Sequence, residues 1–138
     1  MTLSAQYVAG LFDGEGSVSI SMDQHKHRLR VNITNTYYEV LLMIQAQYGG
    51  SIHAERRDRW DSGKVCYTLH MAPKAAIALL QDIEPYVIIK KAQVVTGIMF
   101  QQMMLDSGQQ RLSEGQLAVR EAQRNLIMSL NGKKRTRP

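Results

Sequence analysis

The chain has 138 residues, which suffice for one well-packed domain and are too few for two. Its 17 Lys and Arg outnumber its 12 Asp and Glu, and the net charge of +5 favours a polyanionic partner such as nucleic acid. We expect no membrane contact and no secretory signal, because no run of about 18 apolar residues occurs and the first residues lack a basic stretch before an apolar one. The lone Cys66 excludes an internal disulfide and a zinc site built from several thiolates.

The first elements in chain order are a helix and a hairpin. The helix is expected from Ser4, a plausible N-cap, to Phe12, with glycines after it as the stop. Strict alternation of polar and apolar residues then predicts strands over 17–22 and 28–34, joined by a polar turn at 23–27. One face of this hairpin is apolar, so it is expected to cover a core.

The same arrangement follows a second time. Thr36 and Glu39 have capping-box spacing, which predicts that a helix starts at Thr36 and runs to Tyr48. Strands are expected over 51–60 and 64–71 around a turn at 61–63. A further helix is expected from Pro73 to Ile83.

Two helices and a basic tail complete the chain. Pro85 interrupts the chain, after which helices are expected over 87–105 and 113–130, followed by a basic tail at 133–138. The element order αββαββα, with two additional helices, predicts a single α+β domain over 1–138 whose core spans about 1–105. Helices on one side of an antiparallel sheet leave its other face to solvent or to a ligand.

The open sheet face is expected to be basic and rich in hydrogen-bonding groups. Arg, Lys, Asn and Gln can hydrogen-bond to base edges in the major groove, and Arg and Lys also neutralise phosphates. A solvent-exposed sheet face is polar in any protein, so the pattern by itself favours nucleic-acid binding and an ordinary solvated face equally. The scarcity of exposed aromatic residues favours duplex over single-stranded DNA. The predicted DNA-binding residues are Ser17, Ser19, Ser21, Gln24, His25, Lys26, His27, Arg28, Arg30, Asn32, Thr34, His53, Glu55, Arg57, Arg59, Lys64, Thr68 and His70.

The stretch at 8–16, VAGLFDGEG, is unusual for the end of a helix. Asp13 and Glu15 lie where the helix dipole disfavours carboxylates by ~0.3–1 kcal/mol each. A divalent cation bound by carboxylate and carbonyl oxygens would reverse that penalty, and an ordinary acidic surface turn is the alternative. Ala5, Ala9 and Gly10 are small residues that would let a second helix approach closely.

This stretch resembles, position for position, the motif of the LAGLIDADG homing endonuclease family. Val8, Phe12, Gly14 and Glu15 replace the Leu, Ile, Ala and Asp of the motif. The αββαββα order is also that of the family, and 85–91 (PYVIIKK) is similar to the segment that supplies its basic active-site residue. The resemblance implies a saddle-shaped antiparallel sheet that binds DNA.

The resemblance also implies roles for individual residues. Glu15 matches the acidic position that binds metal, Mg²⁺ with Mn²⁺ as a plausible substitute, and the Gly14 carbonyl is its expected second ligand. Lys90 matches the basic residue near the scissile phosphate, and Lys91 is the alternative. Thr34 and Asn35 fall near a position where the family often has a Gln or Asn that arranges water.

A single motif per chain implies a homodimer acting on double-stranded DNA at a long pseudo-palindromic target. The expected dimer interface comprises Ala5, Ala9, Gly10, Phe12 and Asp13. The alternatives are an RNA-splicing maturase that binds intron RNA, a catalytically inactive DNA-binding relic, and a basic interaction module without nuclease chemistry. The expected location is intracellular, in a chloroplast, a mitochondrion or a prokaryotic cytoplasm.

Overall fold

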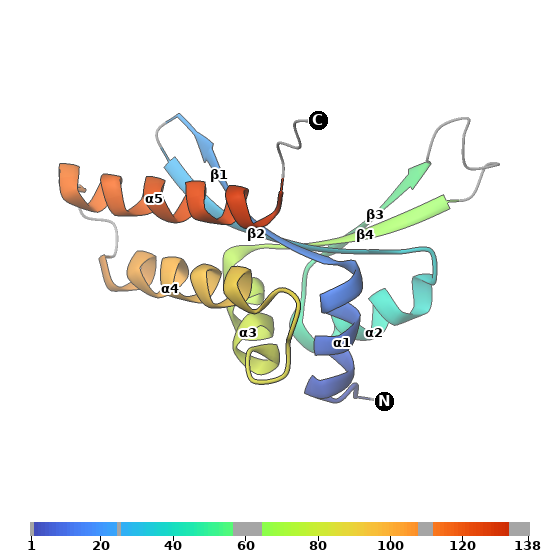
Figure 1. The fold of residues 1–138 in the computed structure, drawn as a ribbon. Helices are drawn as coiled ribbons and strands as arrows, with labels where there is room; N and C mark the ends of the chain where they lie inside the picture. Colours follow the sequence, from blue (N-terminus) through green and yellow to red (C-terminus); the bar gives the residue numbers. More distant parts are fainter. Residues whose placement is uncertain (1, 25, 57–64, 108–111, 133–138) are drawn as a thin grey trace, which may run out of the picture.

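The computed structural model describes residues 2–24, 26–56, 65–107 and 112–132. Figure 1 shows a twisted sheet with helices packed beneath it, the last helix alongside the first hairpin, and the face away from the other helices open. The elements in chain order are α1 (Ala5–Glu15), β1 (Gly16–Asp23), β2 (Lys26–Asn35), α2 (Tyr38–Tyr48), β3 (Ser51–Arg56), β4 (Val65–Met71), α3 (Pro73–Ile83), α4 (Lys91–Ser107) and α5 (Glu114–Leu130). The predicted α+β order of helices and hairpins is therefore confirmed.

The sheet is antiparallel throughout, with strand order β1-β2-β4-β3. The two hairpins meet where β2 pairs with β4. Val18, Val31 and Met71 lie opposite one another across three strands, and all three are at most 4% exposed. Because side chains alternate between the faces of a strand, this register turns the apolar set of each hairpin toward the helices.

The core lies between the sheet and the helices α1, α2, α3 and α4 (Figure 1). Phe12, Leu41 and Leu79 are fully buried within it, and each such side chain contributes ~1.5–3 kcal/mol through burial. α4 approaches the sheet closely at Gly97, where an added Cβ would lie 3.1 Å from Val18 Cγ1. None of the helices among the described residues is long and apolar enough to cross a membrane.

Two helix boundaries at the N-terminal half differ from those predicted. α1 continues to Glu15 rather than ending near Phe12, and Gly16 is its C-cap in extended backbone. The predicted capping box of α2 is wrong, because the helix begins at Tyr38. Asn35 Oδ1 accepts the Tyr37 N–H at 2.8 Å, so a side chain from the end of β2 forms a turn just before the helix.

The helix predicted from Val87 begins only at Lys91. Residues 84–90 form an irregular connection between α3 and α4 instead. Its backbone N–H groups at 88–90 donate to the carboxylate of Asp13 on α1. This connection therefore depends on a contact made across the fold.

The last helix covers the edge of the sheet. The predicted capping box of Ser113 and Gln116 is confirmed at the start of α5. Ile127 of this helix is fully buried, and Asn131 Nδ2 donates to the Val18 carbonyl at 2.9 Å. Because β1 is an edge strand, this cover protects backbone groups that would otherwise pair with another chain.

Candidate functional site

The polar residues predicted on the open face alternate along their strands with the residues of the core. Outward positions in the register are occupied by Ser17, Ser19, Ser21, Lys26, Arg28, Arg30, Asn32, Thr34, His53, Glu55, Thr68 and His70. Gln24 lies exposed in the turn between β1 and β2. The predicted contacts at His25, Arg57, Arg59 and Lys64 lie outside the described residues.

Hydrogen bonds between neighbouring strands order this face. Arg30 Nε donates to Ser21 Oγ at 3.0 Å, and His70 Nδ1 lies 3.0 Å from Asn32 Oδ1. Thr68 needs a correction, because its side chain is only 4% exposed and its hydroxyl lies 3.0 Å from that of Thr34. Thr68 supports its neighbour rather than offering a free group to a ligand.

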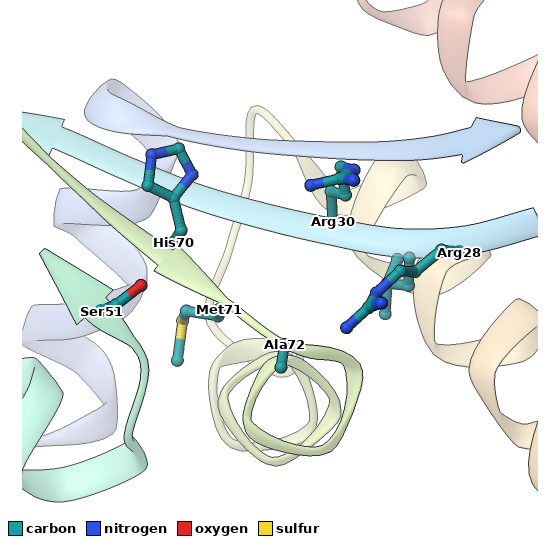
Figure 2. A pocket seen from close by; sticks show the side chains of 7 residues that line it. Arg28, Arg30, Ser51, His70, Met71 and Ala72 are labelled. Carbon is teal, nitrogen blue, oxygen red and sulfur yellow. The ribbon is translucent and has the colours of Figure 1, made fainter. Parts of the chain in front are cut away.

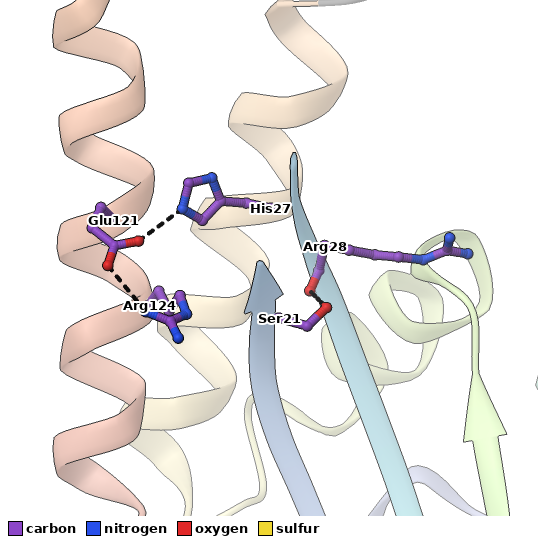
Figure 3. Close-up of polar contacts among 5 residues, drawn as sticks. All are labelled: Ser21, His27, Arg28, Glu121 and Arg124. Atoms are coloured by element: carbon purple, nitrogen blue, oxygen red, sulfur yellow. Dashed lines mark hydrogen bonds and ion pairs between the residues drawn. The ribbon is translucent and has the colours of Figure 1, made fainter. Parts of the chain in front are cut away.

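His27 was predicted on the open face and lies on the opposite one. The strand β2 begins at Lys26, two residues earlier than expected, so the alternation directs His27 inward. Its ring is 6% exposed, and Nε2 lies 2.9 Å from Glu121 Oε1 of α5 (Figure 3). The hydrogen bond from His27 and the nearby Arg124 guanidinium, at 3.0 Å, hold the pKa of Glu121 below its usual value. His27 therefore joins α5 to the sheet.

The C-terminal end of α1 brings the predicted catalytic groups together. Gly14 and Glu15 are exposed in the last turn of the helix. Lys90 Nζ donates to the carbonyl oxygens of Phe12, at 3.4 Å, and of Gly16. A cation at this position interacts favourably with the negative end of the helix dipole.

Asp13 connects α1 to the segment that carries Lys90. One carboxylate oxygen accepts the Ile88 N–H at 2.8 Å, and the other accepts the N–H groups of Ile89 and Lys90 at 3.1 Å each. Partial burial alone would raise the pKa of Asp13, but these hydrogen bonds and the Lys90 charge outweigh it and lower the pKa. The sequence contained only an indirect signal of this role: a carboxylate in the last turn of a helix requires a positive or donating partner.

The two consecutive lysines have different partners. Lys91 Nζ donates to the Glu84 carbonyl oxygen and lies 3.4 Å from Glu84 Oε2. Lys90 alone of the two contacts α1, because the irregular segment at 88–90 is held by Asp13 before α4 begins.

Two residues of the expected dimer interface are not accessible. Phe12 is fully buried and Ala9 is 1% exposed, both within the core of this chain, so the expectation that they contact a partner is wrong. Helical spacing turns these two toward the sheet, while Gly10, on another face of α1, is exposed. Ala5 and Asp13 are partly exposed.

The described residues contain no group of three or more His, Cys, Asp or Glu side chains that could hold a metal ion. The donors at the end of α1 are the Glu15 carboxylate and backbone carbonyls such as that of Gly14. Mg²⁺ prefers oxygen ligands and is commonly held by one or two carboxylates together with substrate phosphates. This donor set fits a Mg²⁺ ion shared with a phosphate ligand, and does not fit a site built from protein groups of one chain alone.

Solved structures with this fold include several homing endonucleases. The chain matches I-CvuI, solved in complex with the I-CreI target, with a TM-score of 0.69 and 20% identity over 96% of this chain and 85% of that one. The archaeal intron-encoded homing endonuclease I-Vdi141I, complexed with DNA, matches with a TM-score of 0.65 and 18% identity over 97% and 86%. The LAGLIDADG meganuclease I-AabMI, bound to uncleaved DNA, matches with a TM-score of 0.62 and 15% identity over 96% of this chain and 45% of that one.

A comparison with curated protein sequences found no match. The model of the LAGLIDADG endonuclease family matches residues 8–96, which include the motif at the end of α1, both hairpins and Lys90. This match spans well over half of the chain, and the chain therefore belongs to the LAGLIDADG endonuclease family.

Proposed function

We propose that the protein is a homing endonuclease that cleaves double-stranded DNA at a long pseudo-palindromic site, as a homodimer and with Mg²⁺. Membership of an endonuclease family provides the reaction class. The observation that carries the proposal is the presence of both an exposed Glu15 and the Lys90 ammonium at the same end of α1. A relic that had lost its chemistry would be under no constraint to retain both groups.

The open face of the sheet supplies the DNA-binding surface in this proposal. Lys26, Arg28 and Arg30 are exposed along β2, and the cross-strand positions next to the two arginines carry serines rather than carboxylates. Such a surface attracts the phosphate backbone and offers donors and acceptors to base edges. Because it is a twisted antiparallel ribbon, it suits the major groove.

The homodimer is supported by apolar and small residues left exposed beside the motif. Gly10 and Gly14 lie one helical turn apart on α1, and an added Cβ at either would meet nothing within 4 Å. Tyr7, Ile88 and Ile89 are 53%, 82% and 74% exposed. A second copy packed on this face would bury these side chains and place two Glu15 residues near each other.

The match to I-AabMI agrees with this assembly. The chain covers 45% of I-AabMI, so it corresponds to somewhat less than half of that protein. It contains one motif, and a two-fold dimer would supply the second. A two-fold enzyme reads each half of a pseudo-palindrome with the same surface.

The proposed mechanism assigns separate roles to this chain's groups. Glu15 and the Gly14 carbonyl would hold a Mg²⁺ ion at the end of α1. The bound ion would supply charge neutralisation at the phosphate and activation of water. Lys90 donates hydrogen bonds to the attacking water or to the phosphate oxygens, where negative charge increases in the transition state. Asp13 fixes the backbone that carries Lys90.

The test is cleavage of a plasmid library that displays pseudo-palindromic sites, with Mg²⁺ or with EDTA, followed by sequencing of the broken ends. We expect breaks at one class of site, only with Mg²⁺, and a dimer mass by light scattering on that site. Site-specific binding without cleavage would indicate the inactive relic instead. Tight binding to structured intron RNA without DNA cleavage would indicate the maturase, and binding to neither would indicate an interaction module.

A further inference from the structure

A basic pocket opens where the two halves of the sheet separate (Figure 2). It encloses about 290 Å³ and is lined by Arg28 and Arg30 of β2, by Ser51 and His70 of the second hairpin, and by Ala72 just before α3. Figure 2 shows the side chains of Arg28, Arg30 and His70 around the same hollow, above Ala72. Neither the family motif nor Lys90 lines this pocket.

The strand register explains why the pocket exists. β2 pairs with β4 only as far as Val31 opposite Met71, whereas β2 itself extends back to Lys26. β4 ends at Met71, and the chain turns at Ala72 into α3. The part of β2 that carries Arg28 and Arg30 is therefore unpaired on this side, and the missing continuation of β4 leaves the hollow.

Two positive charges line this hollow without a compensating carboxylate. Arg28 and Arg30 share a face of β2, and their partners across β1 are Ser21 and Ser19. Neither arginine takes part in an ion pair within the described ranges. Arg30 Nε is occupied by Ser21 Oγ, which leaves its terminal nitrogens as the free donors.

The remaining wall also favours an anion. Ala72 is the N-cap of α3 and provides no side-chain hydrogen bond to the first turn, where Pro73 lacks an N–H. The following backbone N–H groups therefore have no cap from this side chain, and the positive end of the helix dipole lies beside the arginines. The Ser51 hydroxyl adds a group that can donate to oxygen.

We propose that this pocket binds a single phosphate of the DNA backbone, and that Arg28 and Arg30 act there as a clamp rather than as readers of a base. This inference rests on the proposed DNA-binding function. A phosphodiester carries one negative charge that attracts both guanidinium groups and offsets their mutual repulsion, and its oxygens accept from both, whereas a base edge is uncharged and leaves them repelling each other. The clamp fixes the register of the duplex on the sheet without itself selecting a sequence.

The experiment measures DNA affinity across a range of salt concentrations for the native protein, Arg28→Gln and the matched control Arg124→Gln. Arg124 is on α5, paired with Glu121, and its loss removes one charge away from the pocket. Loss of one phosphate contact per protomer should lower the slope of log affinity against log salt by about 0.9 per contact in Arg28→Gln. Affinity for all sequences should fall by the same factor, while the control keeps the native slope.

A second arm locates the phosphate chemically. In a series of duplexes, each has one phosphate replaced by a neutral methylphosphonate. At one position per half-site, this replacement should weaken binding by the native protein and leave binding by Arg28→Gln unchanged. If Arg28→Gln instead relaxes discrimination at one base pair and keeps the salt slope, the residue reads a base and the proposal is overturned. The proposal is also overturned if every methylphosphonate that weakens binding by the native protein weakens binding by Arg28→Gln to the same extent. Absence of specific DNA binding by the native protein would contradict the proposed function itself, which separates the two failures.

Discussion

Replacement of Asp13 by Asn tests whether one carboxylate holds the catalytic segment in place. Asparagine keeps the size of the side chain but exchanges one acceptor oxygen for an NH₂ group. In the native protein Ile88 N–H donates to one oxygen at 2.8 Å, and Ile89 and Lys90 N–H donate to the other at 3.1 Å. Whichever way the amide is turned, at least one backbone N–H faces another donor, and the remaining bonds lose their ionic character.

The magnitude follows from the number and exposure of these bonds. A hydrogen bond to a charged group contributes about 1.5–3 kcal/mol where it is well shielded, and these bonds are partly exposed. We expect Asp13→Asn to lower the free energy of unfolding by about 1–2 kcal/mol at pH 7, which for a domain of this size lowers Tm by about 3–8 °C. Asp23→Asn, which changes an exposed carboxylate at the end of β1, is the matched control and should leave Tm nearly unchanged.

The pH dependence provides an independent check on the same contact. The pKa of Asp13 is lowered in the folded state, so its stabilisation is fully present above its unfolded value of about 3.9 and is lost as pH falls through the folded value. The difference in stability between native protein and Asp13→Asn should therefore be largest at neutral pH and disappear in acid. Urea denaturation at pH 7 and below pH 4 measures both.

Cleavage kinetics separate positioning from stability. At a temperature where both proteins are folded, Asp13→Asn should lower kcat with little change in KM, because it displaces Lys90 and leaves the sheet face intact. Equal Tm values for the native protein and the variant, or a stability difference that persists in acid, would refute the reasoning about Asp13.

Four further predictions concern other parts of the molecule. Glu15→Gln should abolish cleavage yet bind target DNA in EDTA at least as tightly, because the amide cannot hold the cation and no longer repels phosphate; cleavage in Mg²⁺ at the native rate would contradict the metal assignment. Lys90→Met should slow cleavage by about 100-fold or more, while Lys91→Met changes it little, and equal losses would reject the distinction between them. Gly10→Leu should yield a folded monomer by light scattering, because the new side chain meets nothing in its own chain, and a persistent dimer would place the interface elsewhere. Gly97→Val should destabilise by about 1–3 kcal/mol through overpacking against β1, and an unchanged Tm would show that this contact can relax.

Local patterns in the sequence were sufficient to predict the helices and strands and their order along the chain. Alternation over 17–22 and 28–34 predicts the first hairpin because a strand with one buried face must alternate, and the structure pairs these residues as expected. The motif at 8–16 also predicts that Glu15 lies exposed at the end of a helix. Both signals depend on neighbours along the chain, which the sequence contains directly.

Contacts between residues far apart in the chain determine the features that local sequence patterns could not predict. Asp13 accepts from backbone groups 75 to 77 residues later, and this contact holds the segment that carries Lys90 against α1. The sequence predicts His27 in a turn, whereas in the structure β2 begins at Lys26. The strand alternation therefore directs the His27 ring to Glu121, 94 residues away. The physical reason is common to these cases: a polar group is satisfied by whichever donor or acceptor the fold brings to it, and that partner lies far along the chain.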